Sequence, residues 1–140
     1  MQFSSVARST LGFIQKQLGI DHTSITLLQK DIGGFLLYEV GMEIKGIESG
    51  KFLPFEKTVL SEVINHTEPL YRPNIRNWQT EYEVDKILLE AGLRSDFLVP
   101  LIVNGQCIGT LNVASMKTNG IGEKKRFAIQ FLAPRLAQAL

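Results

Sequence analysis

The most regular pattern of apolar and polar residues is a pair of apolar runs between residues 92 and 115. The runs flank Asn104-Gly105, a dipeptide that tolerates the positive φ angles of a type I′ turn and so predicts a tight β-hairpin. The turn type sets the register of the two strands. The expected facing pairs, counted outward from the turn, are Val103 with Gln106, Ile102 with Cys107, and Leu101 with Ile108.

This register predicts a hairpin with two apolar faces. One face is expected to carry Phe97, Val99, Leu101, Val103, Ile108 and Thr110. The other is expected to carry Leu98, Pro100, Ile102, Cys107, Leu111 and Val113. A solvated antiparallel hairpin would alternate apolar with polar residues. We therefore expect this hairpin in the middle of the molecule, with a layer packed on each side.

Apolar periodicity before the hairpin predicts a series of shorter elements. They are a helix over 3–18, strands over 22–29 and 35–40, a helix over 58–66 and a short strand over 70–72. Pro73 suits a strand at the edge of a sheet, because proline cannot donate a ladder hydrogen bond. The segment 41–50 fits either a third strand or a loop.

Two further helices are predicted around the hairpin. Thr80 and Glu83 match a capping box, in which the two side chains satisfy free backbone N–H groups at a helix start. Apolar residues at helical spacing follow, and Gly92 ends that helix. The last helix runs over 123–140 without a stop signal, which suggests a domain excised from a longer protein.

This order of elements predicts a single α+β domain spanning residues 1–140. Its core is a central antiparallel sheet, with the N- and C-terminal helices together on one face. The crossing helices and loops of residues 50–92 must then cover the opposite face.

Composition narrows the function classes. The 140 residues include 15 basic and 14 acidic side chains, for a net charge of +1. Such balance argues against nucleic acid or an anionic membrane as the main partner, since both favour a strong basic excess. No apolar stretch has the length of a membrane span, and one cysteine excludes an internal disulfide. A cytoplasmic location is the default expectation.

The hairpin carries a family resemblance. Leu93-Arg94-Ser95 leads into an apolar strand that ends in Pro100-Leu101, followed by the turn at Gly105 and the strand Ile108-Gly109-Thr110-Leu111. In this order and spacing the chain resembles the GAF domain family over nearly its whole length. The resemblance implies a PAS-like fold that senses small molecules and often dimerises through its terminal helices. It also implies an attached output domain, such as a histidine kinase, a cyclase or a transcription activator.

The specialised members of that family use residues that are mostly missing here. Cys107 is followed by Ile108 rather than by the histidine frequent in bilin-binding members, so we expect it to be a buried wall residue. Members that reduce free methionine sulfoxide use several cysteines. His22 and His66 have no second ligand at metal-like spacing, which disfavours haem and metals. The cyclic-nucleotide signature is also absent, so the cofactor stays unknown.

An aromatic set with a few polar groups predicts a small-molecule pocket over one face of the sheet. Its candidates are Phe55, Tyr71, Arg76, Trp78, Tyr82 and Phe97. Arg94 and Ser95 stand at the rim. Arg94 either caps the preceding helix or pairs with Glu90 or Asp96, or else it contacts a ligand anion through its planar fork.

The alternative is a domain without a ligand that acts as a dimerisation and relay module. Helical spacing in the terminal helices favours pairing across a two-fold axis. The candidate interface residues are Ala7, Leu11, Ile14, Leu18, Leu132 and Leu136. Nothing in the chain resembles a nucleophile with its base or a carboxylate pair for acid–base chemistry. We therefore expect that the domain itself is not an enzyme.

Overall fold

The structure is a computed structural model that describes residues 3–78 and 82–140. Within these residues, six strands form one antiparallel sheet in the order β3-β2-β1-β6-β5-β4. The strands are β1 (His22–Gln29), β2 (Gly34–Gly41), β3 (Phe52–Pro54), β4 (Leu70–Arg72), β5 (Ser95–Val103) and β6 (Gln106–Ser115). The helices are α1 (Ser5–Gln17), α2 (Leu60–His66), α3 (Glu83–Glu90) and α4 (Glu123–Ala139), with single 3₁₀ turns at Lys30–Ile32, Phe55–Lys57 and Ile75–Asn77.

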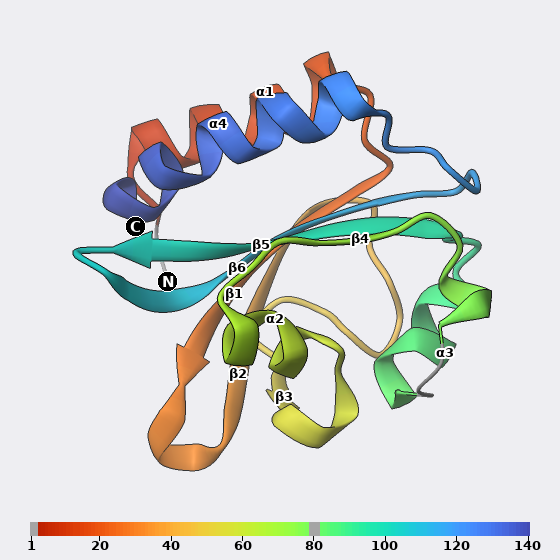
Figure 1. The fold of residues 1–140 in the computed structure, drawn as a ribbon, viewed down its shortest axis with the longest axis horizontal. Helices are drawn as coiled ribbons and strands as arrows, with labels where there is room; N and C mark the ends of the chain where they lie inside the picture. Colours follow the sequence, from red (N-terminus) through yellow and green to blue (C-terminus); the bar gives the residue numbers. More distant parts are fainter. Residues whose placement is uncertain (1–2, 79–81) are drawn as a thin grey trace.

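Helices cover both faces of the sheet. The terminal helices α1 and α4 lie side by side on one face, here called the helix face, while α2, α3 and the loops around them cover the other (Figure 1). The Ser4 hydroxyl donates to the carbonyl of Ala139 over 2.8 Å, so the two ends of the described chain meet. This arrangement confirms the predicted α+β fold with a cover on each side.

Local signals account for the ends of the helices. The backbone N–H of Ala7 donates to Ser4 Oγ over 3.1 Å, which caps the start of α1. Gly19 follows that helix with a φ of 65°, a left-handed conformation that glycine adopts without steric cost. Tyr82 stands at the N-cap of α3. The predicted capping box involves Thr80, which lies outside the described residues.

The central hairpin forms as predicted at its turn and departs from the prediction two residues later. Asn104 and Gly105 have positive φ angles of 51° and 76°, as a type I′ turn requires. Beyond the turn Leu101 faces Gly109, not Ile108, because a β-bulge adds one residue to β6. A Cβ at Gly109 would lie 1.9 Å from the Thr26 carbonyl oxygen of β1, so only glycine fits there.

The bulge reverses the predicted faces of the outer part of β6, and that part of the prediction was wrong. Leu111 and Val113 belong to the helix-face core rather than to the face of Leu98. Thr110 pairs with Pro100 and turns its hydroxyl toward that of Thr26. A one-residue insertion has this effect because side chains alternate strictly along a strand.

The ambiguous segment 41–50 leaves the sheet after β2 and forms a loop. Ile44 and Ile47 of this loop are only 2% and 3% exposed and anchor it on the sheet face opposite the terminal helices. The third strand on this side is instead β3, which pairs with the start of β2. The short strand β4 occupies the opposite edge of the sheet, as Pro73 suggested.

The helical stripe assigned to a dimer interface packs inside the domain. Ala7, Leu11, Ile14 and Leu136 are at most 1% exposed and contact the domain's own sheet, so in this fold a partner cannot reach them. Leu18 and Leu132 are half-buried against the same core. Burial against the sheet explains the helical spacing of these residues equally well.

Candidate functional site

The site lies on the sheet face covered by α2 and α3, and strand register builds its floor. Arg72 of β4 lies opposite Asp96 of β5, which lies opposite Ala114 of β6, which in turn lies opposite His22 of β1. The next row on the same face contains Leu98, Asn112 and Ser24. Four adjacent strands therefore bring polar side chains into one patch, with the small Ala114 between the charged groups.

Apolar residues cover this floor and leave a cavity of about 50 Å³. A water molecule needs roughly 10–15 Å³ of such space, so the cavity has room for a few water molecules or a small organic group. Apolar lining residues come from α2, α3, β3 and the loops around them, among others Ile47, Leu53, Val59, Leu60, Val84 and Leu88.

At one side of the cavity, a buried arginine joins two aspartates. Arg72 is 1% exposed, and its Nε and Nη2 donate to the two carboxylate oxygens of Asp96 over 2.9 and 2.6 Å. Its Nη1 and Nη2 donate to Asp85 over 2.8 and 2.9 Å. Both carboxylates are thus bound in the two-pronged geometry that guanidinium favours. The cluster ties edge strand β4 and helix α3 to strand β5.

Burial and pairing act in opposite directions on these groups. Burial alone would lower the pKa of Arg72, but its bonds to Asp96 and Asp85 outweigh this and raise it, so Arg72 stays charged. Burial raises the pKa of Asp96 although the guanidinium beside it favours the carboxylate. One arginine therefore faces two acidic groups, and the cluster holds an excess of negative charge when both are ionised.

A second ionisable pair borders the other end of the floor. The His22 Nε2 lies 3.2 Å from Glu39 Oε2, and the two side chains are only 5% and 7% exposed. Burial lowers the pKa of His22, against the opposing effect of its bond to Glu39. The imidazole is therefore held toward its neutral form beside a buried carboxylate.

Between these two groups lies Asn112. Its Nδ2 donates to Ser24 Oγ over 3.1 Å. Its Oδ1 is the single buried side-chain nitrogen or oxygen atom in the described part of the chain that has no hydrogen-bond partner. Buried polar atoms are nearly always paired, so an orphaned carbonyl on a cavity wall requires a specific explanation.

Three of the predicted pocket residues, Phe55, Trp78 and Tyr82, pack against the core on the cavity side of the sheet, although neither they nor Arg76 are among the residues that line the cavity. Phe55 packs edge-on against Phe35, and the Trp78 ring lies 5.7 Å from the guanidinium of Arg72. The Tyr82 hydroxyl donates to Glu62, and burial together with this bond raises the pKa of Tyr82 to about 12. The exposed Arg76 bonds to Asn74.

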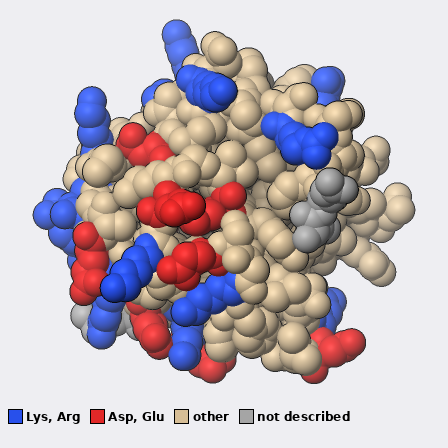
Figure 2. Space-filling view, turned by 180° about the vertical axis from the view of Figure 1, so that it is seen from behind, with Lys and Arg blue, Asp and Glu red and all other residues tan. Residues whose placement is uncertain are grey.

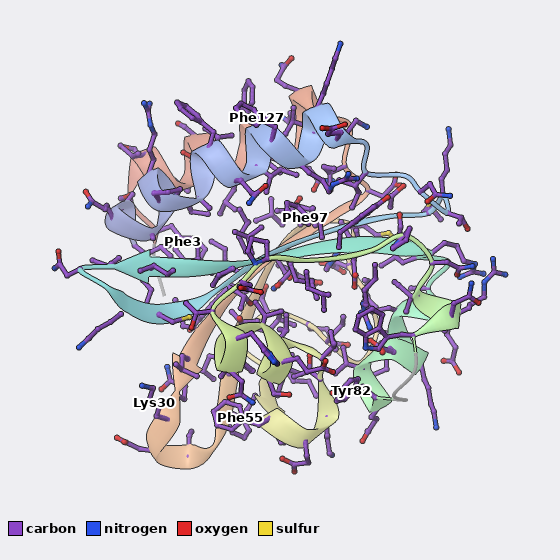
Figure 3. All side chains as sticks on the ribbon, viewed as in Figure 1. Phe3, Lys30, Phe55, Tyr82, Phe97 and Phe127 are labelled. Carbon is purple, nitrogen blue, oxygen red and sulfur yellow. The ribbon has the colours of Figure 1, made fainter. Side chains whose placement is uncertain are left out.

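The other two aromatic candidates lie on the opposite face. Phe97 lies between the sheet and the terminal helices, whereas Phe55 and Tyr82 lie beyond the other side of the sheet (Figure 3). Tyr71 packs edge-on against Phe97 at 6.3 Å between ring centres, and Arg126 lies 4.0 Å above the Tyr71 ring. Strand alternation separates them from the cavity, since their neighbours Arg72 and Leu98 face it.

The two rim candidates have structural partners. Arg94 Nη1 donates to the carbonyls of Leu89 and Leu93 over 3.0 and 2.8 Å, so Arg94 caps the end of α3. This matches the capping interpretation of Arg94, while Asp96 is bound by Arg72 instead. Ser95 Oγ donates to the carbonyl of Lys117 over 2.6 Å and holds the loop before α4.

The remaining candidates lie outside the cavity. Cys107 is only partly buried, with its thiol 3.4 Å from the carbonyl of Gly109, so the expectation of a fully buried wall residue was wrong. His66 contacts the carbonyl of Glu62 through Nδ1 at 2.9 Å, within its own helix. Among the described residues, no group of three His, Cys, Asp or Glu side chains could hold a metal ion.

The surface carries both charge signs. Acidic and basic side chains lie interspersed on the face shown in Figure 2, in keeping with the net charge of +1. None of the helices in residues 3–78 and 82–140 is long and apolar enough to cross a membrane.

Sequence reasoning did not single out Arg72, Asp85, Asp96, Ser24 or Asn112 as site residues. A signal was present: charges of opposite sign occupy positions within the apolar strands 70–72 and 95–103. Charged residues are rarely buried unless they are paired, so such positions indicate a paired cluster. Which strands pair, and that α3 adds Asp85, emerges only from the fold.

Comparison with known proteins identifies the family. A family model of the GAF domain matches residues 2–140. The chain belongs to the GAF domain family. No match is found for it among curated proteins. GAF domains occur in sensor histidine kinases and other signalling proteins, and some proteins of this fold are reductases.

Solved structures share the GAF fold at low sequence identity. The GAF domain of a phosphoenolpyruvate-protein phosphotransferase from Coxiella burnetii has a TM-score of 0.80 at 17% identity, covering 96% of this chain and 81% of that one. The GAF domain of a two-component sensor histidine kinase from Bacillus halodurans has a TM-score of 0.79 at 15% identity, covering 99% and 94%. A free methionine-R-sulfoxide reductase from Neisseria meningitidis, solved in complex with its substrate, has a TM-score of 0.77 at 19% identity, covering 99% and 78%.

Proposed function

We propose that this GAF domain is a sensor that binds a small molecule in the cavity between the sheet and helices α2 and α3. The observation that carries the proposal is the combination of a cavity with a floor of buried charged and polar groups, one of which, Asn112 Oδ1, has no hydrogen-bond partner among the described residues. Ligand sites are mostly apolar concavities with a few convergent polar groups, and this cavity has that composition. The output is a signalling domain such as a histidine kinase.

The alternation of β6 supplies a route from the cavity to the terminal helices. Asn112 faces the cavity, while its neighbours Leu111 and Val113 are fully buried against the helix-face core. A ligand that displaces this strand would therefore also move the packing under α1 and α4. Packed interiors transmit such shifts because they have low compressibility.

The test is a thermal-shift screen with small amines, amides, carboxylic acids and alcohols, followed by a variant that fills the cavity. Ala114→Val adds volume at the centre of the floor, and we expect it to abolish the shift given by any probe that binds the wild type. Ala128→Val on the partly exposed side of α4 is the matched control and should keep that shift. Silence of the whole panel, or equal shifts in Ala114→Val, would contradict a ligand in the cavity.

A second candidate function is dimerisation through the outer surface of the terminal helices. Four large apolar side chains are exposed there, namely Val6, Phe13, Phe127 and Phe131, at 57%, 47%, 73% and 57%. Phe127 points away from the sheet in Figure 3. Exposed apolar patches mark interaction sites, and a second copy of this chain is the partner proposed here.

Sedimentation equilibrium tests the dimer. We expect the wild type to dimerise at micromolar to millimolar concentration, and the double variant Phe127→Glu/Phe131→Glu to be monomeric with its fold intact. A wild type that stays monomeric at the highest concentration would rule out this function. The ligand proposal would be unaffected by that result.

A further inference from the structure

A buried amide oxygen on the cavity wall, unpaired among the described residues, indicates the class of ligand. Asn112 is 9% exposed, and its Oδ1 accepts no hydrogen bond from the described residues. Its amide nitrogen is already engaged by Ser24. A buried carbonyl without a donor is destabilising, and a ligand can relieve this only by bringing an N–H or O–H group.

The charges around the cavity also favour a ligand that donates hydrogen bonds, and they favour one that carries a positive charge. Arg72 supplies one positive charge, against two acidic side chains that it binds, Asp85 and Asp96. Across the floor, Glu39 is paired with a histidine held toward its neutral form by burial. Buried charges are normally paired, so this wall has capacity for one further cation.

Unused acceptor positions exist on the same carboxylates. Each carboxylate oxygen of Asp85 and Asp96 accepts one hydrogen bond from Arg72, whereas an ionised carboxylate offers about four acceptor sites. Asp96 and Asn112 are diagonal neighbours in the register of β5 and β6, a separation of about 7 Å between backbones. A short molecule can therefore reach both.

The remaining walls and the volume of the cavity limit the size and the polarity of the rest of the ligand. Its walls are apolar, with Leu37, Leu98 and Leu88 on different sides, and its volume is about 50 Å³. A few carbon atoms fill this space without opening α3. The ligand is thus a short hydrocarbon with one polar head.

We propose that the cavity binds a small protonated primary amine, whose ammonium group donates to Asn112 Oδ1 and to the carboxylates of Asp85 and Asp96. The inference rests on the proposed sensor function and adds the chemical class of the ligand. Binding would pair the orphaned carbonyl and balance the excess negative charge in one step. A carboxylate or phosphate ligand would do neither.

The experiment titrates the 140-residue chain with propylammonium, propanoate and propan-1-ol, three probes of similar length, and follows the backbone amide resonances of Leu111 and Val113, the neighbours of residue 112, by NMR. We expect propylammonium to bind roughly tenfold or more tightly than propanoate, because only the cation complements this wall. Asn112→Leu should weaken propylammonium by a similar factor, with no loss of melting temperature in its absence. Asn77→Leu, at an exposed position, is the matched control and should leave binding unchanged.

Asn112→Asp adds a second readout that does not depend on Asn112→Leu folding well. It keeps an acceptor and adds negative charge, so propylammonium should bind more tightly to it than to the wild type. Equal binding of propylammonium to wild type and Asn112→Leu would place the amine on surface carboxylates and overturn the inference. Preferential binding of propanoate in the cavity would overturn it too, while leaving the sensor function in place. Silence of the wider panel, or equal shifts in Ala114→Val, would overturn both the sensor function and the ligand class.

Discussion

The two faces of the sheet are made by the same strands, yet they have different interiors. The helix-face core combines α1 and α4 with residues such as Leu101, Leu111 and Val113 and is built from aliphatic and aromatic side chains. The opposite face holds the buried ionisable side chains found in the described part of the chain, namely His22, Glu39, Arg72, Asp85 and Asp96. It also holds the cavity.

This difference separates two tasks within one fold. The helix face gains its stability from the burial of closely packed apolar side chains. Such a core depends little on the exact identity of each apolar residue but loses stability when buried volume is removed. The cavity face depends on charged groups that must stay paired, because a buried charge without a partner is strongly destabilising.

The largest effect should come from breaking the charged cluster. Arg72→Met removes the positive charge and leaves Asp85 and Asp96 buried together, at an expected loss of about 3–5 kcal/mol in the free energy of unfolding. Urea denaturation measures this loss. Arg76→Met is the control, since Arg76 is exposed and bonds locally to Asn74, and it should change stability by about 0.5 kcal/mol or less.

Arg72→Lys sharpens the result, because lysine keeps the charge but lacks the planar fork that binds two carboxylates. We expect its stability to lie between those of the wild type and Arg72→Met. If Arg72→Met were as stable as Arg76→Met, the cluster would not hold the cavity face together.

The same deletion on each face should give unequal losses. Leu111→Ala opens a void in the helix-face core, where Leu111 is fully buried, at a cost of about 2–5 kcal/mol. Leu98→Ala removes the same atoms from a wall of the cavity, where part of the side chain already lacks packing partners. We expect a smaller loss for Leu98→Ala in parallel urea denaturation experiments. A larger loss for Leu98→Ala would reverse the proposed division.

The smallest effect concerns pH. Burial lowers the pKa of His22 below its ordinary value of 6.5, so on acidification the unfolded chain takes up this proton before the folded chain does. The contribution of His22 to stability is therefore present above 6.5 and is lost as the pH falls through that value toward the lowered pKa. The slope for one proton is at most about 1.4 kcal/mol per pH unit.

Thermal or urea unfolding between about pH 7.5 and 5 measures this slope. His22→Gln should flatten the curve, whereas His66→Gln, at an exposed position on α2, serves as the control. Asp96 contributes with the opposite sign, because burial raises its pKa and its contribution is lost as the pH rises. The difference between wild type and His22→Gln isolates the histidine. A slope unchanged by His22→Gln would contradict the prediction.

The elements were predictable because their signals are local. Asn104-Gly105 specifies a hairpin turn through its own backbone preferences, and the apolar spacing of 3–18 specifies a helix whatever it packs on. The family resemblance depended on the same stretch. The register beyond the bulge was not predictable, since Gly109 is required by the Thr26 carbonyl of a strand more than eighty residues earlier.

The candidate site was harder to predict for the same reason. The number of aromatic residues in one part of the chain suggested a pocket. The alternation of side chains along β4 and β5, however, places Tyr71 and Phe97 on the helix face. The residues that line the cavity came together only through pairing of β4 with β5 and the position of α3. Their individual positions gave no indication of a shared site.

The chain alone was enough to predict the α+β class, the order of the elements, the central place of the hairpin and the family. These properties depend on interactions between residues close in the chain, or on apolar spacing that any core would satisfy. The three-dimensional fold was needed to establish which face each side chain of β6 joins, that the stripe of α1 is internal, and that Arg72 meets Asp85 and Asp96. Those outcomes depend on backbone approach and charge pairing between distant segments, and local preferences do not encode them.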